Sequence, residues 1–466
     1  MKTPVYDFLM GHAGRNPVSF HMPGHKGSAI YRRFGYDEFF GKLMDCDVTE
    51  ITGADNLFQT EGIIKEAQER YARLYGSKNS YLLINGTSGG IIAAIMAAVP
   101  KGKKLIMARN SHKSVFNALT LADVKPVYAY PCVIPEYGIS GAIPPEQIDA
   151  LLSEHKDAEA VILPSPNYYG ICCDTEKIAD IVHKHGKVLI IDEAHGAHLT
   201  FFNKYGSKGL PKSAGNSGAD IVITSIHKTL ASFTQSALLN LNSDRVDRYL
   251  LEDKLQCVES TSPSYILMAS LDINASIIEE HGKQLFTEWE DNIEYFYKNA
   301  EKIPGLSVIG KRADMDRTKL NFSLGIHGGE LEKRLIEKYD IFIELYTGTL
   351  VMCMTGIGTT RDHIDRLMAA LSETAGTAAS RADEKPVMRL DPKPAELFDI
   401  PIIKRRVPLA EAEGLICTSS IIPYPPGIPL VCPGERLDAD IIGYVKELRE
   451  RGEKVIGVSD NGEVSV

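Results

Sequence analysis

Short apolar segments alternate with amphipathic stretches through the first half of the chain. Between the apolar segments, residues 89–98, 113–122, 145–155 and 175–185 have helical periodicity. Strand–helix–strand alternation predicts an α/β fold with a mostly parallel sheet that helices cover on both faces. The six expected strands are SYLLI (80–84), KLIMA (104–108), PVYAY (126–130), AVILP (160–164), VLIID (188–192) and IVITS (221–225).

The same pattern divides the chain into units. Residues 1–60, rich in Gly, Pro, His and aromatic residues, predict an irregular N-terminal arm, and residues 61–300 a large domain that ends in long helical segments over 265–300. Residues 301–372 predict a smaller α/β domain. Residues 373–386 are small, polar and charged, which is typical of a linker, and residues 387–466 predict a C-terminal domain. Its Pro-rich stretch at 421–435 is interpreted as packed loop rather than a polyproline ligand.

Composition excludes several classes of protein. The chain has 466 residues, a net charge of −10 and a hydrophobic fraction of 44%, and the acidic balance argues against nucleic-acid binding. No apolar run approaches the roughly 18–20 residues that span a bilayer, and the first residues do not resemble a signal peptide. The eight cysteines form no C-x-x-C pair or zinc spacing. We expect a cytoplasmic protein that binds no metal and no membrane.

The strongest chemical signal is the lysine in SIHKT at 225–229, directly after an expected strand. In open α/β sheets ligands bind at the carboxyl ends of the strands, which is where Lys228 would lie. Burial lowers the pKa of a lysine and makes its amine a nucleophile toward carbonyl groups. For a lysine taken alone, a solvated loop position is the alternative.

A second signal is VLIIDEAHGAH at 188–198. Asp192 ends an expected strand, and a buried carboxylate needs a partner such as a protonated pyridine nitrogen. Ala194 would leave room for a flat ring. His195 and His198 could form a metal pair, but no third ligand is evident. The helicase-like letters DEAH would require a G-x-x-x-x-G-K-[ST] loop, which the sequence lacks.

Two further segments follow expected strands. NGTSGG at 85–90 opens a helix, so Gly86, Thr87 and Ser88 could form a phosphate site with the free backbone N–H groups. A glycine-rich helix start without a ligand is an equally good interpretation of this segment alone. His112, in RNSHKS, could stack on an aromatic ring. Together with Lys228 and Asp192, these groups match the chemical features of pyridoxal 5′-phosphate.

The order and spacing of these segments resemble fold-type I pyridoxal-phosphate enzymes. FHMPGHKG, DVTEITGADNL, NGTSGG, DEAHGAH, SIHKTL, TSPSYILMASLD and PYPPGIP together resemble the prokaryotic ornithine/lysine/arginine decarboxylase family, from about Phe20 to Glu435. The chain is similar to the short members, without an extra N-terminal regulatory domain. The resemblance implies an aminotransferase-like large domain and pyridoxal phosphate as cofactor.

The resemblance also implies roles for individual residues. Lys228 matches the Schiff-base lysine and Asp192 the partner of the pyridinium nitrogen. The residues expected to sandwich the ring are Ala194 and His112. The expected phosphate ligands are Gly86, Thr87, Ser88, Ser225 and His227. The remaining expected contacts are Asn167 with the ring oxygen, His195 beside the substrate, and Thr261 and Ser262 with the cofactor of a partner subunit.

The implied reaction is decarboxylation of a basic L-amino acid in polyamine metabolism, with Lys228 or His227 returning the proton. The implied active unit is a homodimer or a multiple of it. Arginine, giving agmatine, is the first choice of substrate, followed by lysine and ornithine. Arginine-active short members often carry Glu near the position of Ser419. The carboxylate that binds the substrate side chain must then come from another residue, and the candidates are Glu50, Asp55 and Glu259. The alternatives are an aminotransferase or aldol-type lyase, with Arg361 binding the substrate carboxylate, and a catalytically silent scaffold.

Overall fold

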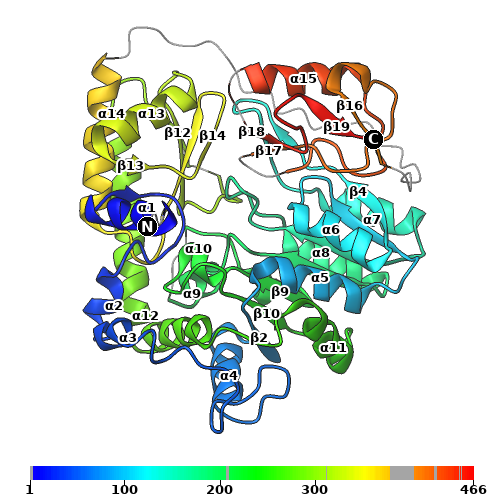
Figure 1. Ribbon diagram of the computed structural model, residues 1–466, viewed down its shortest axis with the longest axis horizontal. Helices are drawn as coiled ribbons and strands as arrows, with labels where there is room; N and C mark the ends of the chain where they lie inside the picture. The colour runs from blue at the N-terminus through cyan, green and yellow to red at the C-terminus, as the bar shows by residue number, and fades with distance from the viewer. Residues whose placement is uncertain are drawn as a thin grey trace.

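The computed structural model describes residues 4–205, 209–310, 312–377, 404–424, 428–450, 452 and 454–466. A large α/β unit, a smaller α/β unit and a C-terminal unit lie around a common centre (Figure 1). Among the described residues, no helix is long and apolar enough to cross a membrane.

The centre of the large unit is a seven-stranded sheet in the order β2-β10-β9-β8-β7-β3-β4. Only β10 runs antiparallel to its neighbours, so the expectation of a mostly parallel sheet is confirmed. The strands are β2 (Asn79–Leu83), β3 (Lys104–Ala108), β4 (Lys125–Ala129), β7 (Ala158–Pro164), β8 (Val188–Asp192), β9 (Ile221–Thr224) and β10 (Ala237–Leu241). β10 was not among the expected strands.

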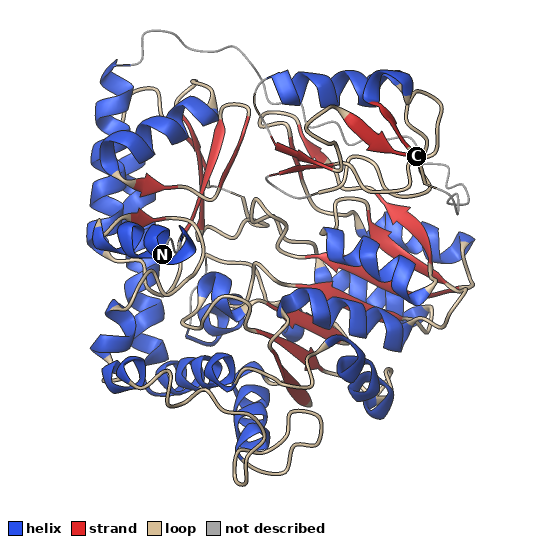
Figure 2. Ribbon diagram, viewed as in Figure 1, coloured by secondary structure: helices blue, strands red, loops and turns tan. Residues whose placement is uncertain are grey.

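Helices cover both faces of this sheet (Figure 2), and successive residues of a strand pack against opposite layers of helices. Leu83, Leu105 and Ile190 lie in one apolar cluster with helices α5, α6 and α11. On the other face, Leu82 packs with α4 and α12, and Ile106 packs with α7 and α8. The helices are α4 (Ile63–Tyr75), α5 (Gly86–Ala98), α6 (Lys113–Ala122), α7 (Pro145–Glu154), α8 (Thr175–Lys184), α9 (Leu199–Tyr205), α10 (Ile226–Thr229), α11 (Arg248–Val258) and α12 (Tyr265–Ala300).

The small unit contains a four-stranded antiparallel sheet in the order β11-β12-β15-β14. Its strands and helices are β11 (Ser307–Ile309), β12 (Lys319–Ser323), β14 (Leu345–Thr347), β15 (Leu350–Met354), α13 (Gly328–Tyr339) and α14 (Arg361–Thr377). The first five positions of the expected linker are therefore helical, and residues 378–386 lie outside the described residues.

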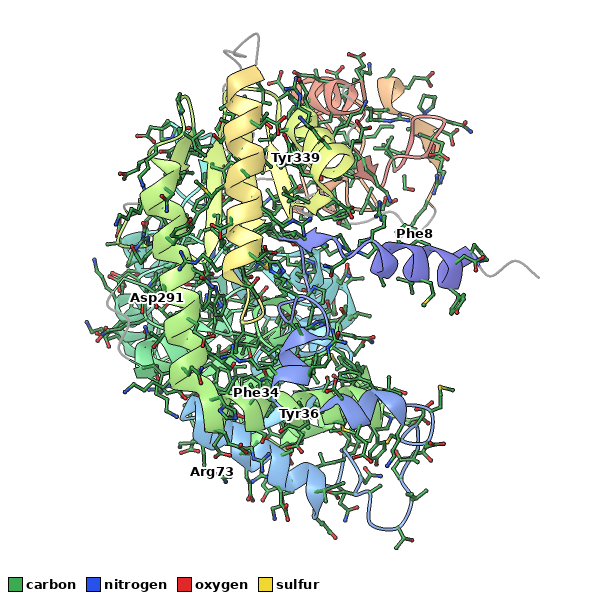
Figure 3. The ribbon with its side chains drawn as sticks, turned by 90° about the vertical axis from the view of Figure 1, so that its left-hand side faces the viewer. Phe8, Phe34, Tyr36, Arg73, Asp291 and Tyr339 are labelled. Carbon is green, nitrogen blue, oxygen red and sulfur yellow. The ribbon has the colours of Figure 1, made fainter. Side chains whose placement is uncertain are left out.

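The N-terminal arm joins this small unit. β1 (Val18–Ser19) pairs in parallel with β13 (Ile341–Phe342), and two short helices follow, α2 (Ala29–Arg33) and α3 (Asp37–Gly41). Helix α1 (Pro4–Gly14) projects from the body of the molecule (Figure 3) and exposes Tyr6, Phe8, Leu9 and Met10.

The C-terminal unit packs around its own apolar cluster, which includes Leu409, Val431 and Val445. It lies beside β4 and α7 of the large unit (Figure 1). Its elements are β16 (Arg406–Pro408), β17 (Ile422–Tyr424), α15 (Ala439–Glu450), β18 (Lys454–Ile456) and β19 (Glu463–Ser465).

Candidate active site

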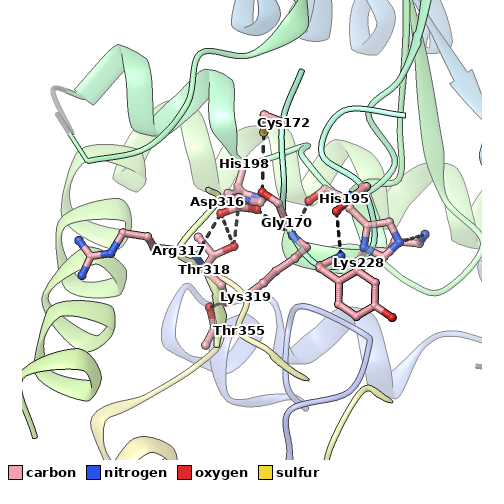
Figure 4. A network of polar contacts seen from close by, with 12 residues as sticks. Gly170, Cys172, His195, His198, Lys228, Asp316, Arg317, Thr318, Lys319 and Thr355 are labelled. Carbon is pink, nitrogen blue, oxygen red and sulfur yellow. Dashed lines mark hydrogen bonds and ion pairs between the residues drawn. The ribbon is translucent and has the colours of Figure 1, made fainter. Parts of the chain in front are cut away.

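Lys228 lies in the single turn of α10, directly after β9, as the sequence predicts. Its Nζ is 3.0 Å from Nε2 of His195 and 5.9 Å from the centre of the Tyr168 ring (Figure 4). Burial lowers the pKa of Lys228, and the nearby carboxylate of Asp192 partly opposes that shift. The amine is therefore poised to act as a nucleophile.

Asp192 is the last residue of β8, and only 6% of its surface is exposed. Its Oδ1 accepts a hydrogen bond of 3.1 Å from the backbone N–H of Ala194. Burial raises the pKa of Asp192, while the ammonium of Lys228 lowers it. A buried carboxylate with so few donors favours a cationic partner.

A single cavity brings most of the expected residues together. Because β3, β7, β8 and β9 are parallel, the residues that follow them meet at one edge of the sheet. Side chains from the small and C-terminal units are not needed for this convergence, although Ile428 of the C-terminal unit adds an apolar wall. The cavity is lined by Thr87, Asn110, His112, Pro164, Pro166, Asn167, Tyr168, Asp192, Ala194, His195, Lys228 and Ile428.

The expected phosphate site is the N-terminus of α5. Gly86 has a φ of +67°, a conformation that side chains other than glycine rarely adopt, and begins the helix. Ser225 Oγ donates to Thr87 Oγ1 at 3.3 Å, which joins the helix to the end of β9. Nδ1 of His227 lies 2.9 Å from the carbonyl oxygen of Ser236, so in the tautomer that donates this bond Nε2 is an acceptor.

His112 is held in place by helix capping. Its Nδ1 accepts from the backbone N–H of Ser114 and is 2.9 Å from the hydroxyl of that residue, at the start of α6. Burial, and then the charge of Lys228, lower its pKa to about 3. The ring is thus neutral and fixed, as a stacking residue requires.

Not every expected residue is oriented as the sequence suggested. The amide of Asn167 lines the cavity but donates to the carbonyl of Ser140 at 2.9 Å and accepts from Tyr169 and Ile171, so it also stabilises its own turn. Its neighbour Asn110, which the sequence did not single out, has a buried Oδ1 that finds no partner among the described residues. Thr261 and Ser262 are exposed and do not line the cavity of their own chain.

The alternative role for Arg361 finds no support in its position. Its guanidinium lies 3.8 Å from the ring centre of Tyr295 and donates to Asn292 and Asp291. It lines a different hollow, between α12 and the start of α14, and not the cavity of Lys228.

The arm motif HMPGHKG packs against the segment that carries Lys228. Gly24 donates to the carbonyl of His227 at 2.8 Å, and a Cβ on Gly24 would lie 2.4 Å from the backbone of Thr229. His21 forms an ion pair of 2.8 Å with the buried Glu344. Burial would raise the pKa of Glu344, but the contact with His21, together with the charges of Lys228 and Lys26, lowers it overall. Glu344 lies in no motif that the sequence offered, so it was not among the expected site residues.

The cavity fits pyridoxal phosphate by the chemistry of its donors. It combines an amine of lowered pKa, a buried carboxylate with one backbone donor, a neutral fixed imidazole and the hydroxyls of Thr87 and Ser225 at a helix N-terminus. These are the groups that an aldehyde, a ring nitrogen, an aromatic face and a phosphate need.

Comparisons with known proteins agree with this geometry. The family model described as Orn/Lys/Arg decarboxylase, major domain, matches residues 3–313, and the model of the C-terminal domain matches residues 377–461. Arginine decarboxylase of Bacillus anthracis is 33% identical over 98% of this chain and 95% of its own, and that of Bacillus subtilis is 33% identical over 99% and 96%.

The solved structure of Escherichia coli constitutive lysine decarboxylase has the same fold, with a TM-score of 0.77 and 20% identity over 100% of this chain and 82% of its own. The family models confirm the resemblance, the enzyme class and the pyridoxal-phosphate cofactor that the sequence predicted. This chain therefore belongs to the Orn/Lys/Arg decarboxylase family.

Proposed function

We propose that this chain decarboxylates a basic L-amino acid to its amine and CO2, with arginine first, then lysine, then ornithine. The observation that carries the proposal is the meeting of Lys228, Asp192, His112 and the start of α5 in one cavity. The preference for arginine is supported by the relatives named arginine decarboxylase, which match nearly the full chain at 33% identity. An aminotransferase is less well supported, because Arg361 lies in a different hollow.

Each cavity residue has a proposed part in holding the cofactor. Lys228 would bind its aldehyde through Nζ, and Asp192 would keep a proton on the ring nitrogen. His112 and Ala194 would lie against the ring, while Asn167 and His195 would contact its rim or the substrate. The phosphate would be bound by Gly86, Thr87, Ser88 and Ser225. His227 is less suitable than the sequence suggested, because a neutral ring that donates from Nδ1 to Ser236 presents only an acceptor, Nε2, to the phosphate oxygens. When bound, pyridoxal phosphate supplies an electron sink for the bond electrons that the departing CO2 leaves behind.

The residue that returns the proton to the product is proposed to be Lys228. His227 was the other candidate, but burial lowers its pKa to about 4, so it carries no spare proton near neutral pH. Nζ of Lys228 is 3.0 Å from Nε2 of His195, and a proton can be exchanged over that distance. Ile428, Pro164 and Pro166 give the same cavity an apolar wall.

The carboxylate that reads the substrate side chain is proposed to be Glu50 or Glu259, from this chain or its neighbour. Asp55 is less suitable, because its two oxygens accept backbone hydrogen bonds from Asn56, Glu61, Gly62, Ile64 and Lys65. Glu50 is exposed, and Glu259 has a buried Oε1 without a partner within the described part of the chain.

A homodimer is proposed as the active unit. The apolar side chains of Tyr6, Phe8, Leu9 and Met10 on α1 are more than half exposed, which is costly for a lone chain. The exposed Thr261 and Ser262 would reach the cofactor of the partner. Mixing Lys228→Ala chains with Thr261→Ala/Ser262→Ala chains should restore some activity, because one hybrid site is intact. No recovery in hybrids verified by native mass spectrometry contradicts shared sites.

The location is proposed to be the cytoplasm, which fractionation of the source cells would test. The reaction itself is tested by kcat/KM for arginine, lysine and ornithine, with leucine as a neutral control and the amine products identified by mass spectrometry. Preference for leucine would overturn the basic-substrate proposal. Preference for lysine over arginine would overturn only the ranking.

A further inference from the structure

A buried ion pair lies behind the Lys228–His195 contact. Lys319, at the start of β12, donates from Nζ to Asp316 Oδ2 at 2.8 Å and to the backbone carbonyl of His195 at 2.8 Å. Both charged side chains are 0% exposed. The ammonium group of Lys319, from the small unit, thus contacts the backbone of His195 (Figure 4).

The pair is held by further contacts on the side away from Lys228. Asp316 Oδ1 accepts a hydrogen bond of 2.7 Å from the hydroxyl of Thr318, and Asp316 Oδ2 lies 3.1 Å from Nε2 of His198. Burial would raise the pKa of Asp316, but the ammonium of Lys319 and the contact with His198 lower it well below its ordinary range. Asp316 is therefore ionised, and the pair is a fixed dipole whose positive end lies at His195.

Breaking such a pair is costly, and two well-packed apolar groups often replace it without loss. A fully buried Lys–Asp pair is therefore not explained by its contribution to stability alone. Its position suggests a second role, because the ammonium of Lys319 contacts the residue that contacts the reactive amine.

We propose that Lys319 and Asp316 form a positioning pair that fixes His195 and keeps a positive charge behind Lys228, so that the Lys228 amine loses its proton more readily. The proposal rests on the proposed function, in which the neutral amine of Lys228 binds the cofactor aldehyde. Lys319 is not a catalytic residue, because its contacts are with Asp316 and the backbone of His195.

Among the described residues, the charged and titratable groups around Lys228 are Asp192, Glu344, Lys319, His195, His112, His227 and Tyr168. Burial lowers the pKa of Lys228 most; Asp192 and Glu344 raise it, and Lys319 lowers it. Burial, followed by Lys228 and Lys319, also lowers the pKa of His195. Removing the Lys319 charge should thus raise the pKa of Lys228, whether or not Asp316 then takes up a proton.

The experiment measures the pKa of Lys228 in the full chain after its cofactor has been removed. The rate at which an acetylating reagent labels Lys228 is followed against pH by peptide mass spectrometry, with the exposed Lys101 as internal reference. Lys319→Met should raise the pKa by about one unit, as expected for the loss of a charge roughly 10 Å away at an effective dielectric near 20. The double variant Asp316→Asn/Lys319→Met should raise it by less, because it also removes the opposite charge of Asp316.

Lys319→Gln separates charge from positioning, because its amide can still donate to the His195 carbonyl. We expect its Lys228 pKa to rise as in Lys319→Met. This variant and the neutral double variant still test the proposal if Lys319→Met does not fold. The control is Asp220→Asn, which disrupts the contact of 2.9 Å between the buried Asp220 and His183, at the end of β9 away from Lys228. It should lower the melting temperature and leave the Lys228 pKa unchanged.

A Lys228 pKa that stays within about 0.2 unit of wild type in every folded Lys319 variant, or that moves equally in Asp220→Asn, would overturn the proposal. Failure of the proposed function is distinguishable. In that case the wild-type protein, before cofactor removal, would lack the visible absorption of lysine-bound cofactor and would not decarboxylate any basic amino acid.

Discussion

Replacing Arg109 with Met should release the loop over residues 428–435 of the C-terminal unit from the candidate site. Arg109 follows β3, and its guanidinium donates to the carbonyls of Pro429 and Leu430 at 2.7 and 2.9 Å and to Glu435 Oε2 at 3.1 Å. Both charged side chains are at least 92% buried. Methionine keeps most of the volume but leaves Glu435 without its counter-charge.

The size of the effect follows from that burial. Removing one partner of a buried, hydrogen-bonded ion pair costs about 3–5 kcal/mol. At tenfold per 1.36 kcal/mol, the loop should open between about 10² and 10⁴ times more often. Hydrogen exchange measures this opening directly. The amides of Leu430, Cys432 and Gly434 donate bonds of 2.8–2.9 Å to Ile421, Glu435 and Cys417 within the C-terminal unit, and they should exchange faster by up to that factor once Arg109 no longer holds the loop.

The amides of β7 and β8 serve as internal references, because they lie within the central sheet. The matched variant is Arg248→Met, which removes an exposed pair with Glu252 one helical turn away. Such a surface pair contributes about 0.3–0.5 kcal/mol, so exchange in the loop should not change. An acceleration below about tenfold in Arg109→Met would refute the claim that this ion pair docks the loop.

Three further outcomes are expected. Borohydride reduction should fix the cofactor on the peptide that contains Lys228, and Lys228→Ala should abolish turnover; recovery of the label on another lysine would contradict the assignment. Asp192→Asn should raise the activation barrier by more than ~4 kcal/mol and so lower kcat by at least about a thousandfold, because an amide cannot hold a proton on the ring nitrogen. A near-normal kcat would contradict that role. Burial raises the pKa of Glu259 to about 7 in the folded chain. The folded state is therefore most stable below the ordinary carboxyl pKa, where Glu259 is neutral, and the free energy of unfolding falls as pH rises from there through about 7. Glu259→Gln should flatten this fall in denaturant titrations across pH, and an unchanged slope would show that Glu259 does not titrate in the folded chain.

The sequence predicted the central sheet because its strands are buried on both faces. Runs such as VLIID and IVITS are almost wholly apolar, and their strands are found at Val188–Asp192 and Ile221–Thr224. β10 was missed because no helical period precedes it and it joins the sheet in the antiparallel sense. Its apolar run ALLNL was the only signal.

The candidate site divides in the same way. Asp192 ends a strand, and Lys228 and His112 each lie shortly after one, so local sequence and the parallel order of the sheet were enough to bring them together. Lys319 donates to a carbonyl 124 residues away, and Met22 donates to Glu344 across 322 residues. Contacts at such separation depend on how the units pack, which periodicity does not encode.

The pairing of buried charges ties that packing to the chemistry of Lys228. Glu344 and Lys319 belong to the small unit and act on the Lys228 amine with opposite sign. Glu344 is compensated by His21 of the arm, while Lys319 is compensated by Asp316 of its own unit. A buried charge without its partner is expensive, so neither group can leave its position while the units stay docked. A shift of the small unit relative to the sheet would move both charges at once, and the protonation of the Lys228 amine would follow the docking of the units.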